Sequence, residues 1–293
     1  MKIVISGASG MVGSELKRQL EADGQEIISL VRRAPTSASE ASWDPATGSA
    51  PQSVIESADA VINLSGASLG KLPWLPGYRK KILQSRMQTT GTLAAAIGAA
   101  SSPPAVFLSA SAVGFYGDRP GEVLTEASAP GVGFLSDLVE QWESAARVTN
   151  ATTRVVTLRT GLVLGDGGSA APIVALSKIG LGSRLGNGRA DWPWISIHDE
   201  AAAIRHLLTS TLSGPVNLTG PTPATSDDIT RYVAKKLNRP YIFRIPRWVI
   251  LAALQGAGNI LLFMSQNVSP ERLVADGFIF RDSTARQAID SFL

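Results

Sequence analysis

The sequence predicts an α/β fold in which helices cover both faces of a doubly wound, mainly parallel sheet, with a smaller and mainly helical lobe at the C-terminus. Short apolar runs alternate with helical stretches through the first 220 residues, which is typical of parallel strands joined by crossover helices. A glycine-rich turn joins the first of these runs to an amphipathic helix. From about residue 221 the alternation gives way to helices separated by prolines.

We therefore expect residues 1–220 to form the α/β domain, with an insertion near residues 172–192 that lines a substrate cleft. Residues 221–293 are expected to form a lobe on the substrate side of the sheet. The 293 residues, of which 44% are hydrophobic, suffice for a core of this size.

Six short runs are predicted to be strands. They are residues 2–6, 26–31, 60–64, 105–109, 154–159 and 216–218. Among them, residues 60–64, 105–109 and 154–159 have the apolar pattern of strands buried on both faces of a parallel sheet. Helices are predicted over residues 12–23, which precede Gly24, and over residues 78–100, whose second half is rich in alanine. The apolar run 248–264 predicts a buried helix of the C-terminal lobe, with contact to a membrane surface as the alternative.

Composition excludes several kinds of function. The chain has no cysteine, so disulfides, thiolate nucleophiles and cysteine-ligated metals are excluded, and its two histidines are too few for a histidine-rich metal site. The net charge of +3 is spread without the cationic tract of a nucleic-acid-binding arm, and the run 248–264 is too short to span a bilayer. No signal peptide is recognisable. We expect a cytoplasmic monomer or homodimer that binds a small-molecule substrate, with no nucleic-acid partner and no stable membrane insertion.

The glycine-rich turn has the pattern of a dinucleotide-binding loop. Gly7, Gly10 and Gly13 follow the first strand and open a helix, with Ser9, Met11 and Val12 between them. Gly7 allows the tight turn, Gly10 lets the backbone approach a pyrophosphate, and Gly13 lets the helix pack closely on the sheet. The helix N-terminus then offers free N–H donors to the phosphates. The context predicts a Rossmann-type site; a tight turn without a ligand is the alternative.

Two arginines follow the second predicted strand and favour NADP(H) over NAD(H). An NAD-selective site places an acidic residue there to accept a hydrogen bond from the ribose 2′-hydroxyl. This chain has Arg32 and Arg33 instead. Guanidinium groups offer forked donors to a 2′-phosphate, which a carboxylate would repel. The alternative is that both arginines are simply solvated.

Further motifs follow these in a fixed order along nearly the whole chain. They are residues 63–67, Ser85-Arg86 with Thr89-Thr90, residues 109–117, 159–165 and 194–199, and, near the C-terminus, Pro246 with residues 266–273 and 277–280. In order and spacing they resemble the extended short-chain dehydrogenase/reductase superfamily. Within it, the chain is similar to the atypical, epimerase-like family of nucleoside-diphosphate-sugar epimerases with a C-terminal domain of unknown function.

The resemblance implies roles for particular residues. Cofactor contacts are implied at Gly7, Ser9, Gly10, Met11, Val12 and Arg32, and at Ser65, Gly66 and Ala67, where the backbone passes the adenine-side ribose. Ser111 falls where these enzymes keep a hydroxyl that hydrogen-bonds a substrate carbonyl or alcohol. The alternative for Ser111 is a serine that caps a turn.

The resemblance also shows a departure. Typical members carry Tyr-x-x-x-Lys on the following helix, where the lysine lowers the tyrosine pKa for acid–base work. Here residues 133–143 contain neither tyrosine nor lysine, and Leu135 and Val139 align with the expected pair. A Tyr-x-x-x-Lys string at Tyr232 and Lys236 lies in the C-terminal lobe, far from the expected place.

Three interpretations remain open. The first is an NADP(H)-binding oxidoreductase or epimerase that uses another acid or base, with Ser111 and Tyr116 as catalytic residues and Asp118, His198 or Asp199 as further candidates. For Asp199 a structural cap of the helix that follows is the favoured interpretation. The second is a catalytically inactive NADP(H)-binding sensor or scaffold. The third replaces the nucleotide sugar by another polar metabolite, for which Arg189 would suit an anionic group, although a solvated surface arginine explains Arg189 equally well.

Overall fold

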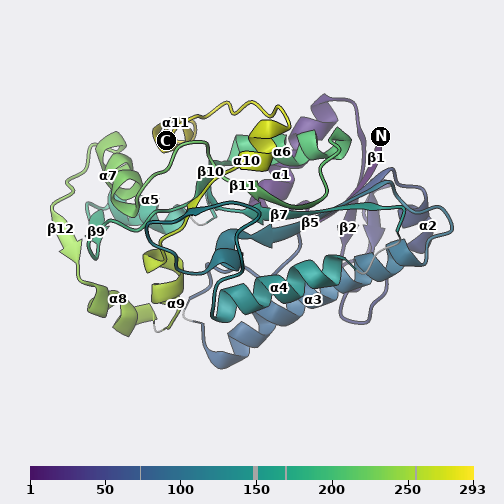
Figure 1. Cartoon of the computed structure of the whole chain (residues 1–293). Helices are drawn as coiled ribbons and strands as arrows, with labels where there is room; N and C mark the ends of the chain where they lie inside the picture. Colours follow the sequence, from purple (N-terminus) through teal and green to yellow (C-terminus); the bar gives the residue numbers. More distant parts are fainter. Residues whose placement is uncertain (73, 148–150, 169, 255) are drawn as a thin grey trace.

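Seven parallel strands form the central sheet. Their order is β11 (Gly214–Leu218), β7 (Arg154–Thr160), β5 (Val106–Ala112), β4 (Ala60–Asn63), β1 (Lys2–Ser6), β2 (Glu26–Val31) and β3 (Glu40–Ser42) (Figure 1). The computed structural model describes all residues except 73, 148–150, 169 and 255. Because the chain builds outward from β1 in both directions, the sheet is doubly wound, which confirms the predicted fold class.

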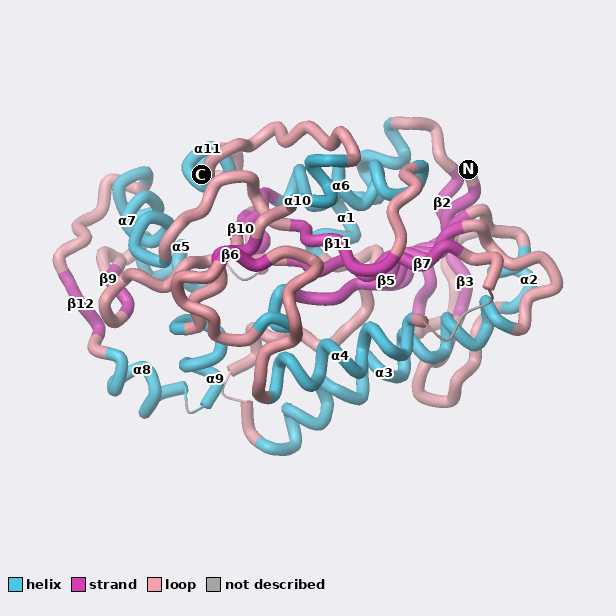
Figure 2. The backbone as a smooth tube through the Cα atoms, in the orientation of Figure 1, coloured by secondary structure: helices cyan, strands magenta, loops and turns pink. Residues whose placement is uncertain are grey.

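Helices cover both faces of this sheet (Figure 2). On one face α1 (Met11–Ala22) packs against α6 (Ile197–Thr209). On the other face lie α2 (Gln52–Glu56), α3 (Pro76–Gly98) and α4 (Phe134–Ala146), with α3 and α4 in contact along their lengths. The helix after each strand therefore begins at the carboxyl edge of the sheet, where ligands of such folds bind.

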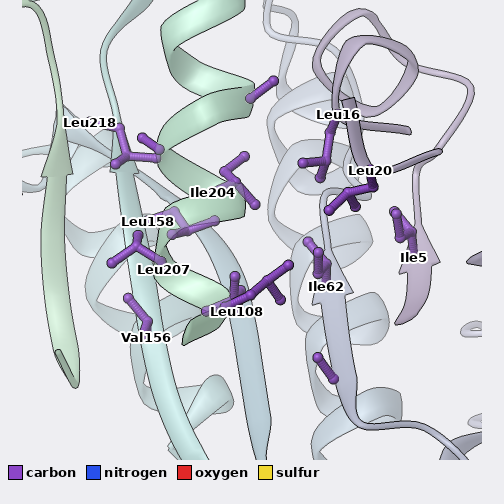
Figure 3. Packing of buried hydrophobic residues seen from close by; sticks show 14 of the residues in the cluster. Ile5, Leu16, Leu20, Ile62, Leu108, Val156, Leu158, Ile204, Leu207 and Leu218 are labelled. Atoms are coloured by element: carbon purple, nitrogen blue, oxygen red, sulfur yellow. The ribbon is translucent and has the colours of Figure 1, made fainter. Parts of the chain in front are cut away.

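Alternating side chains of the strands divide the core between these two faces. Ile3 and Ile5 of β1 lie in the cluster beneath α1 and α6, whereas Val4 lies in the cluster beneath α2 and α3. Figure 3 shows side chains of the first cluster, among them Leu16, Leu20, Ile62, Leu108, Leu158 and Ile204. Burial on both faces explains why the strands are continuous apolar runs.

The C-terminal lobe is built from two stretches of chain. The first contributes α5 (Ala171–Lys178) and β9 (Ser183–Leu185), and the second contributes α7 (Ser226–Lys236), β12 (Phe243–Ile245), α8 (Arg247–Leu254), α9 (Gly256–Gly258) and the π-helical turn η2 (Asn259–Phe263). Strands β9 and β12 pair in parallel. Two further short pairs join β8 (Leu162–Leu164) to β10 (Trp194–Ser196) and β6 (Val123–Leu124) to β13 (Asn267–Val268). The tail ends in α10 (Glu271–Ala275) and α11 (Ala285–Asp290).

Two sequence expectations need correction. Strand β5 runs to Ala112 rather than ending at residue 109, because its parallel register with β7 continues to the pair Ala112 and Thr160. The run 248–264 is not one buried helix. It breaks into α8, α9 and η2 around Gly256 and Gly258, and Trp248 is 72% exposed; residue 255 of this run lies outside the described residues. Among the described residues, no helix is both long and apolar enough to cross a membrane.

One acid is enclosed in the core beside the carboxyl edge. Glu200, in the first turn of α6, accepts a hydrogen bond of 2.7 Å from the Thr160 hydroxyl through Oε1. Its Oε2 has no hydrogen-bond partner among the described residues. Burial raises the pKa of Glu200 to about 8, and the Thr160 hydroxyl offsets only part of this effect. The side chain is therefore protonated in the folded protein at neutral pH.

This acid should make stability depend on pH. Below pH 4.5, the ordinary pKa of a glutamate, the carboxyl is protonated in both the folded and the unfolded protein. Between pH 4.5 and about pH 8 only the unfolded protein loses this proton, so folding becomes progressively less favourable as the pH rises. We expect Glu200→Gln to gain up to a few kcal/mol in unfolding free energy, relative to the wild type, between pH 5 and pH 8. Urea unfolding across this range measures the difference, with the exposed Glu271→Gln as control. If the difference in unfolding free energy between Glu200→Gln and the wild type were the same at pH 5 and at pH 8, the expectation would be wrong.

Candidate functional site

The N-terminus of α1 forms an open anion site at the carboxyl edge. The first amides of a helix have no intrahelical acceptor, which here concerns Met11, Val12 and Gly13. The N-cap is Gly10, which has no side chain to satisfy them, and the first turn has no acidic residue. The helix dipole adds positive potential at the same point. The arrangement suits a diphosphate.

Glycines are required in this loop by close backbone contacts. Gly7 has a φ of +77°, and a Cβ there would lie 2.8 Å from the Leu64 carbonyl carbon. A Cβ on Gly13 would overlap the Gly7 carbonyl oxygen. The contact lets α1 start directly over β1, beside the point where the strand order reverses between β1 and β4. Ser9 and Gly10 are exposed at this point.

The two arginines after β2 have different surroundings. Arg33 forms a two-pronged ion pair with Glu40 of β3, with N–O distances of 2.6 and 2.8 Å, and also donates to the Ala34 carbonyl. The hydrogen bonds from Arg33 and the amide of Thr36 lower the pKa of Glu40 to about 2. Arg32 is exposed and makes no ion pair with any described residue. Only Arg32 is therefore available to an added anion without breaking an existing contact.

The loop after β4 is held from below by α3. Ser85 accepts a hydrogen bond from the Ala67 amide at 3.0 Å, and Thr89 donates to the Ser65 carbonyl at 3.3 Å. Gly66 between them is exposed. Ser85 and Thr89 thus fix the backbone of residues 65–67, a role that the sequence analysis did not assign to them.

Arg86 is a buried cation under this loop. Its Nη1 donates to the carbonyls of Ala67 and Ile82, and its guanidinium lies 4.8 Å from the ring centre of Trp142. No acidic residue pairs with it among the residues described. Burial lowers the pKa of Arg86 to about 10, so it remains charged at neutral pH. A positive charge therefore lies directly beneath Gly66.

Ser111 lies within β5 in a buried polar network, not in a loop after the strand. Its hydroxyl donates to Glu143 Oε1 of α4 at 2.7 Å. Arg159 of β7 binds both oxygens of Glu143, at 2.8 and 3.0 Å. Burial acts to lower the pKa of Arg159, but the hydrogen bonds and charge of Glu143 outweigh it and raise that pKa. The ion pair is thus buried and charged, with Ser111 as its third member.

Tyr116 extends the same network. It ends the 3-10 turn η1 (Val113–Tyr116) and is fully buried. Its hydroxyl accepts from Arg159 at 3.0 Å and donates to Asn217 Oδ1 of β11 at 2.6 Å. Burial raises the pKa of Tyr116, and the Arg159 charge offsets this only in part. The phenol is therefore protonated at neutral pH. The structure thus brings Ser111 and Tyr116 together around Arg159 and Glu143, two residues that the sequence analysis did not single out as a site.

Two of the three other acid–base candidates, Asp118 and Asp199, bind backbone amides in the C-terminal part of the chain. Asp118 Oδ1 accepts from the Ser265 amide at 2.8 Å. Asp199 accepts from the amides of Arg281 and Asp282, at 3.0 and 2.9 Å. The cap of α6 is Ser196, whose hydroxyl accepts from the Asp199 amide, so Asp199 is not itself the cap. His198 lies 3.3 Å from Asp199 Oδ1.

The remaining residues that the sequence analysis named either pack or pair within the fold or lie at the surface. Leu135 of α4 packs beneath Gly114, where a Cβ would lie 3.2 Å from its own, and Val139 is buried in the same cluster. Tyr232 and Lys236 both bind Asp290 of α11, so this pair ties two helices of the lobe together. Arg189 is exposed.

A cavity of about 640 Å³ lies away from the α1 N-terminus, between α4 and the strands β7 and β11. Its walls include Glu143, Arg159, Phe115, Thr157 and Pro215. None of the residues 7–13 of the dinucleotide-binding loop lines this cavity. The cavity is therefore separate from the uncapped N-terminus of α1.

Comparison with known proteins agrees with this architecture. The chain matches the NAD dependent epimerase/dehydratase family over residues 3–219 and a domain of unknown function, DUF1731, over residues 245–292. It is 37% identical to an epimerase family protein of Mycobacterium leprae, with 98% of this chain and 94% of the relative covered. Human epimerase family protein SDR39U1 is 33% identical, with coverage of 95% and 94%.

Solved structures show the same likeness. A crystal structure of human epimerase family protein SDR39U1 (isoform 2) with NADPH superimposes with a TM-score of 0.91 at 30% identity, covering 100% of this chain and 99% of that one. The UDP-glucose 4-epimerase of Thermus thermophilus in complex with NAD has a TM-score of 0.76 at 18% identity, covering 99% and 97% of the two chains, which shows a likeness of fold alone.

The buried ion pair yields a stability prediction. Glu143→Ala would leave Arg159 buried without its partner, so we expect the unfolding free energy to fall by about 3–5 kcal/mol. Ser111→Ala removes one hydrogen bond to a charged group and should cost about 1.5–3 kcal/mol. Urea denaturation measures both, with Glu140→Ala on the exposed side of the same helix as control. If Glu143→Ala were no more costly than this control, the network would not stabilise the fold.

Proposed function

Since the chain belongs to the NAD dependent epimerase/dehydratase family, we propose that it is an NADP(H)-binding oxidoreductase or epimerase that acts on a carbonyl or sugar-nucleotide-like metabolite. The observation that carries the proposal is the pairing of an uncapped α1 N-terminus with an unpaired arginine after β2. The first suits a diphosphate and the second suits an additional phosphate on the adenine-side ribose.

In this proposal the residues of the loop bind the cofactor through their backbone. The amides of Met11, Val12 and Gly13 donate to the diphosphate, while Gly7 and Gly10 keep Cβ atoms away from it. Residues 65–67, held by Ser85 and Thr89, form the wall on which the adenine-side ribose rests. When bound, the nicotinamide would supply or accept a hydride.

The preference for NADP(H) rests on Arg32 rather than on both arginines. Arg33 is already held by Glu40, so its role is to shape the turn between β2 and β3. The structure of the human relative was obtained with NADPH, which supports this preference. Several more distant neighbours were solved with NAD, so the preference is a property to be tested on this chain.

For proton transfer we retain Ser111 and Tyr116 as the proposed groups. Because the Tyr116 phenol is protonated at neutral pH, it would act as a proton donor to a carbonyl oxygen rather than as a base. Arg159 would then stabilise the phenolate left behind, since its Nη1 lies 3.0 Å from the phenol oxygen. Reaching a substrate requires Tyr116 to exchange its hydrogen bond to Asn217 for one to the substrate.

A second candidate function is favoured by one observation. The hydroxyls of Ser111 and Tyr116 are both buried and hydrogen-bonded within the protein, and α4 contains neither tyrosine nor lysine. A chain with this arrangement suits an NADP(H)-binding sensor or scaffold that does not turn over. Tight binding of NADPH without turnover on a broad panel of carbonyls and sugar nucleotides would establish this function.

The role of Arg32 is tested by cofactor affinity. Loss of a charged donor to the 2′-phosphate should weaken NADPH binding by about ten- to a hundredfold in Arg32→Ala and leave NADH binding unchanged. Arg33→Ala serves as the matched control and should have the smaller effect. Titration calorimetry of Arg32→Ala and Arg33→Ala with NADPH and with NADH gives the four dissociation constants, which are compared with those of the wild type. An unchanged NADPH-to-NADH ratio in Arg32→Ala would rule out this assignment, and no saturable binding of either cofactor would overturn the proposed function.

The proton-transfer step is tested separately by turnover. Tyr116→Phe keeps the ring and its packing but removes the hydroxyl, so activity should fall by about 10²- to 10⁴-fold while NADPH affinity is retained. Ser111→Ala should reduce activity as well. Steady-state rates on any substrate found in the panel measure both effects. Full activity in Tyr116→Phe would exclude this residue as the proton donor.

A further inference from the structure

Two segments of the C-terminal lobe, residues 167–190 and 229–270, contain no acidic residue. Together they hold nine of the 27 lysines and arginines and none of the 24 aspartates and glutamates, so the remainder of the chain carries a net charge of −6. The modest overall charge of +3 therefore conceals a separation of charge between these two segments and the rest of the chain, which includes Asp227 and Asp228 of α7.

The structure brings these two segments together. Strand β9 of the first pairs with β12 of the second, which places Arg184 beside Arg244, and α5 packs against α7. The loop around Gly180 lies against Pro240. Figure 1 places α5, α7, β9, β12 and α8 at the end of the molecule opposite α2. The elements α5, β9, α7, β12 and α8, which carry most of these cations, thus lie at one end of the protein.

Large apolar side chains are exposed on the same elements. Ile179 is 69%, Ile242 78% and Trp248 72% exposed. Further exposed members are Leu176, Leu181 and Phe243. Exposed apolar groups that gather on one part of a surface mark an interaction site. We call these six residues, together with Lys178, Arg184, Arg231, Lys235, Lys236, Arg239 and Arg244, the lobe-end patch.

The cations of this patch are largely uncompensated. Arg184 and Arg231 share Asp227, and Lys236 pairs with Asp290. The others include Lys178, Lys235, Arg239 and Arg244, which are exposed and form no ion pair with any residue that the structure describes. The lobe-end patch therefore combines exposed apolar side chains with unpaired positive charge.

We propose that the lobe-end patch docks peripherally on an anionic lipid surface. Aliphatic and tryptophan side chains interleaved with lysine and arginine match the composition of surfaces that lie in the headgroup region. Anionic headgroups attract the cations, and the apolar tips enter the boundary of the acyl chains. A nucleic acid fits the charge but leaves Ile179, Leu181 and Ile242 without a counterpart. The inference is independent of the cofactor and of the proposed chemistry.

The test is co-sedimentation of the full chain with vesicles of phosphatidylglycerol mixed with phosphatidylcholine, compared with phosphatidylcholine alone. We expect binding only to the anionic vesicles, and weaker binding as salt is raised, because the attraction is screened. The double variant Ile242→Ser with Trp248→Ser should weaken binding at least about tenfold, since it removes two large apolar groups from the contact. Lys235→Glu with Arg239→Glu should weaken it as well.

Ile279→Ser is the matched control, because Ile279 is 88% exposed but lies outside the lobe-end patch. Circular dichroism and thermal unfolding show that each variant is folded. No binding to anionic vesicles, or equal binding by the double variant and the control, would overturn the proposal. Tighter binding to a single-stranded oligonucleotide than to vesicles would also overturn the proposal and assign the patch to nucleic acid. Loss of self-association in the double variant, without a change in vesicle binding, would overturn it and assign the patch to a second copy of the chain.

Discussion

The buried ion pair between Arg159 and Glu143 is the interaction on which the architecture of the candidate catalytic region depends. Removing two charges from water costs several kcal/mol per ion, so such a pair persists only where hydrogen-bonding groups surround it in fixed positions. Ser111 satisfies the carboxylate, Tyr116 accepts from the guanidinium, and Asn217 in turn accepts from Tyr116. These groups come from β5, η1 and β11, so a single pair in β7 and α4 fixes the relative placement of three further elements. Asn217 also donates to the Ser269 carbonyl, which extends the same constraint to the C-terminal tail.

The carboxyl edge is consequently divided into an open half and a closed half. At the open half the first amides of α1 and the guanidinium of Arg32 have no partner among the described residues that a ligand must displace. At the closed half the hydroxyls of Ser111 and Tyr116 are already satisfied, and Asp118 and Asp199 hold the tail. The proposed dinucleotide would therefore displace no hydrogen bond among the described residues there, whereas the proposed proton transfer by Tyr116 would require its hydrogen bond to Asn217 to be exchanged. For this physical reason the structure supports the proposed cofactor more directly than it supports the proposed reaction.

Sequence reasoning succeeded where a residue acts through its local pattern. Strands 2–6 and 26–31 were predicted to the residue because burial on both faces makes them continuous apolar runs, and the resemblance to epimerase-like proteins is confirmed. The prediction missed β3, a three-residue edge strand that contains Glu40, and ended β5 early because its serines are typical of loops. The pairs of Arg33 with Glu40 and Arg159 with Glu143 could not be predicted, because they depend on which elements the topology makes neighbours. The domain boundary between residues 220 and 221 stays a prediction. The roles of the individual cofactor-binding and catalytic residues also stay predictions.

The absence of Tyr-x-x-x-Lys from α4 is built into the packing of this helix. Leu135 fills the space beneath Gly114, and Val139 is buried in the cluster that also contains Trp142. One turn along the same face, Trp142 stacks on the buried guanidinium of Arg86. A lysine at position 139 would add a buried cation to a helix face on which Glu143, one turn along, is already paired with Arg159 and Ser111. A tyrosine at position 135 would need room that η1 now occupies. The face of α4 on which the resemblance places the catalytic pair of typical members is here a packed surface that contains Leu135, Val139 and Trp142. Leu135 and Val139 therefore offer no acid or base for proton transfer at these two positions of α4.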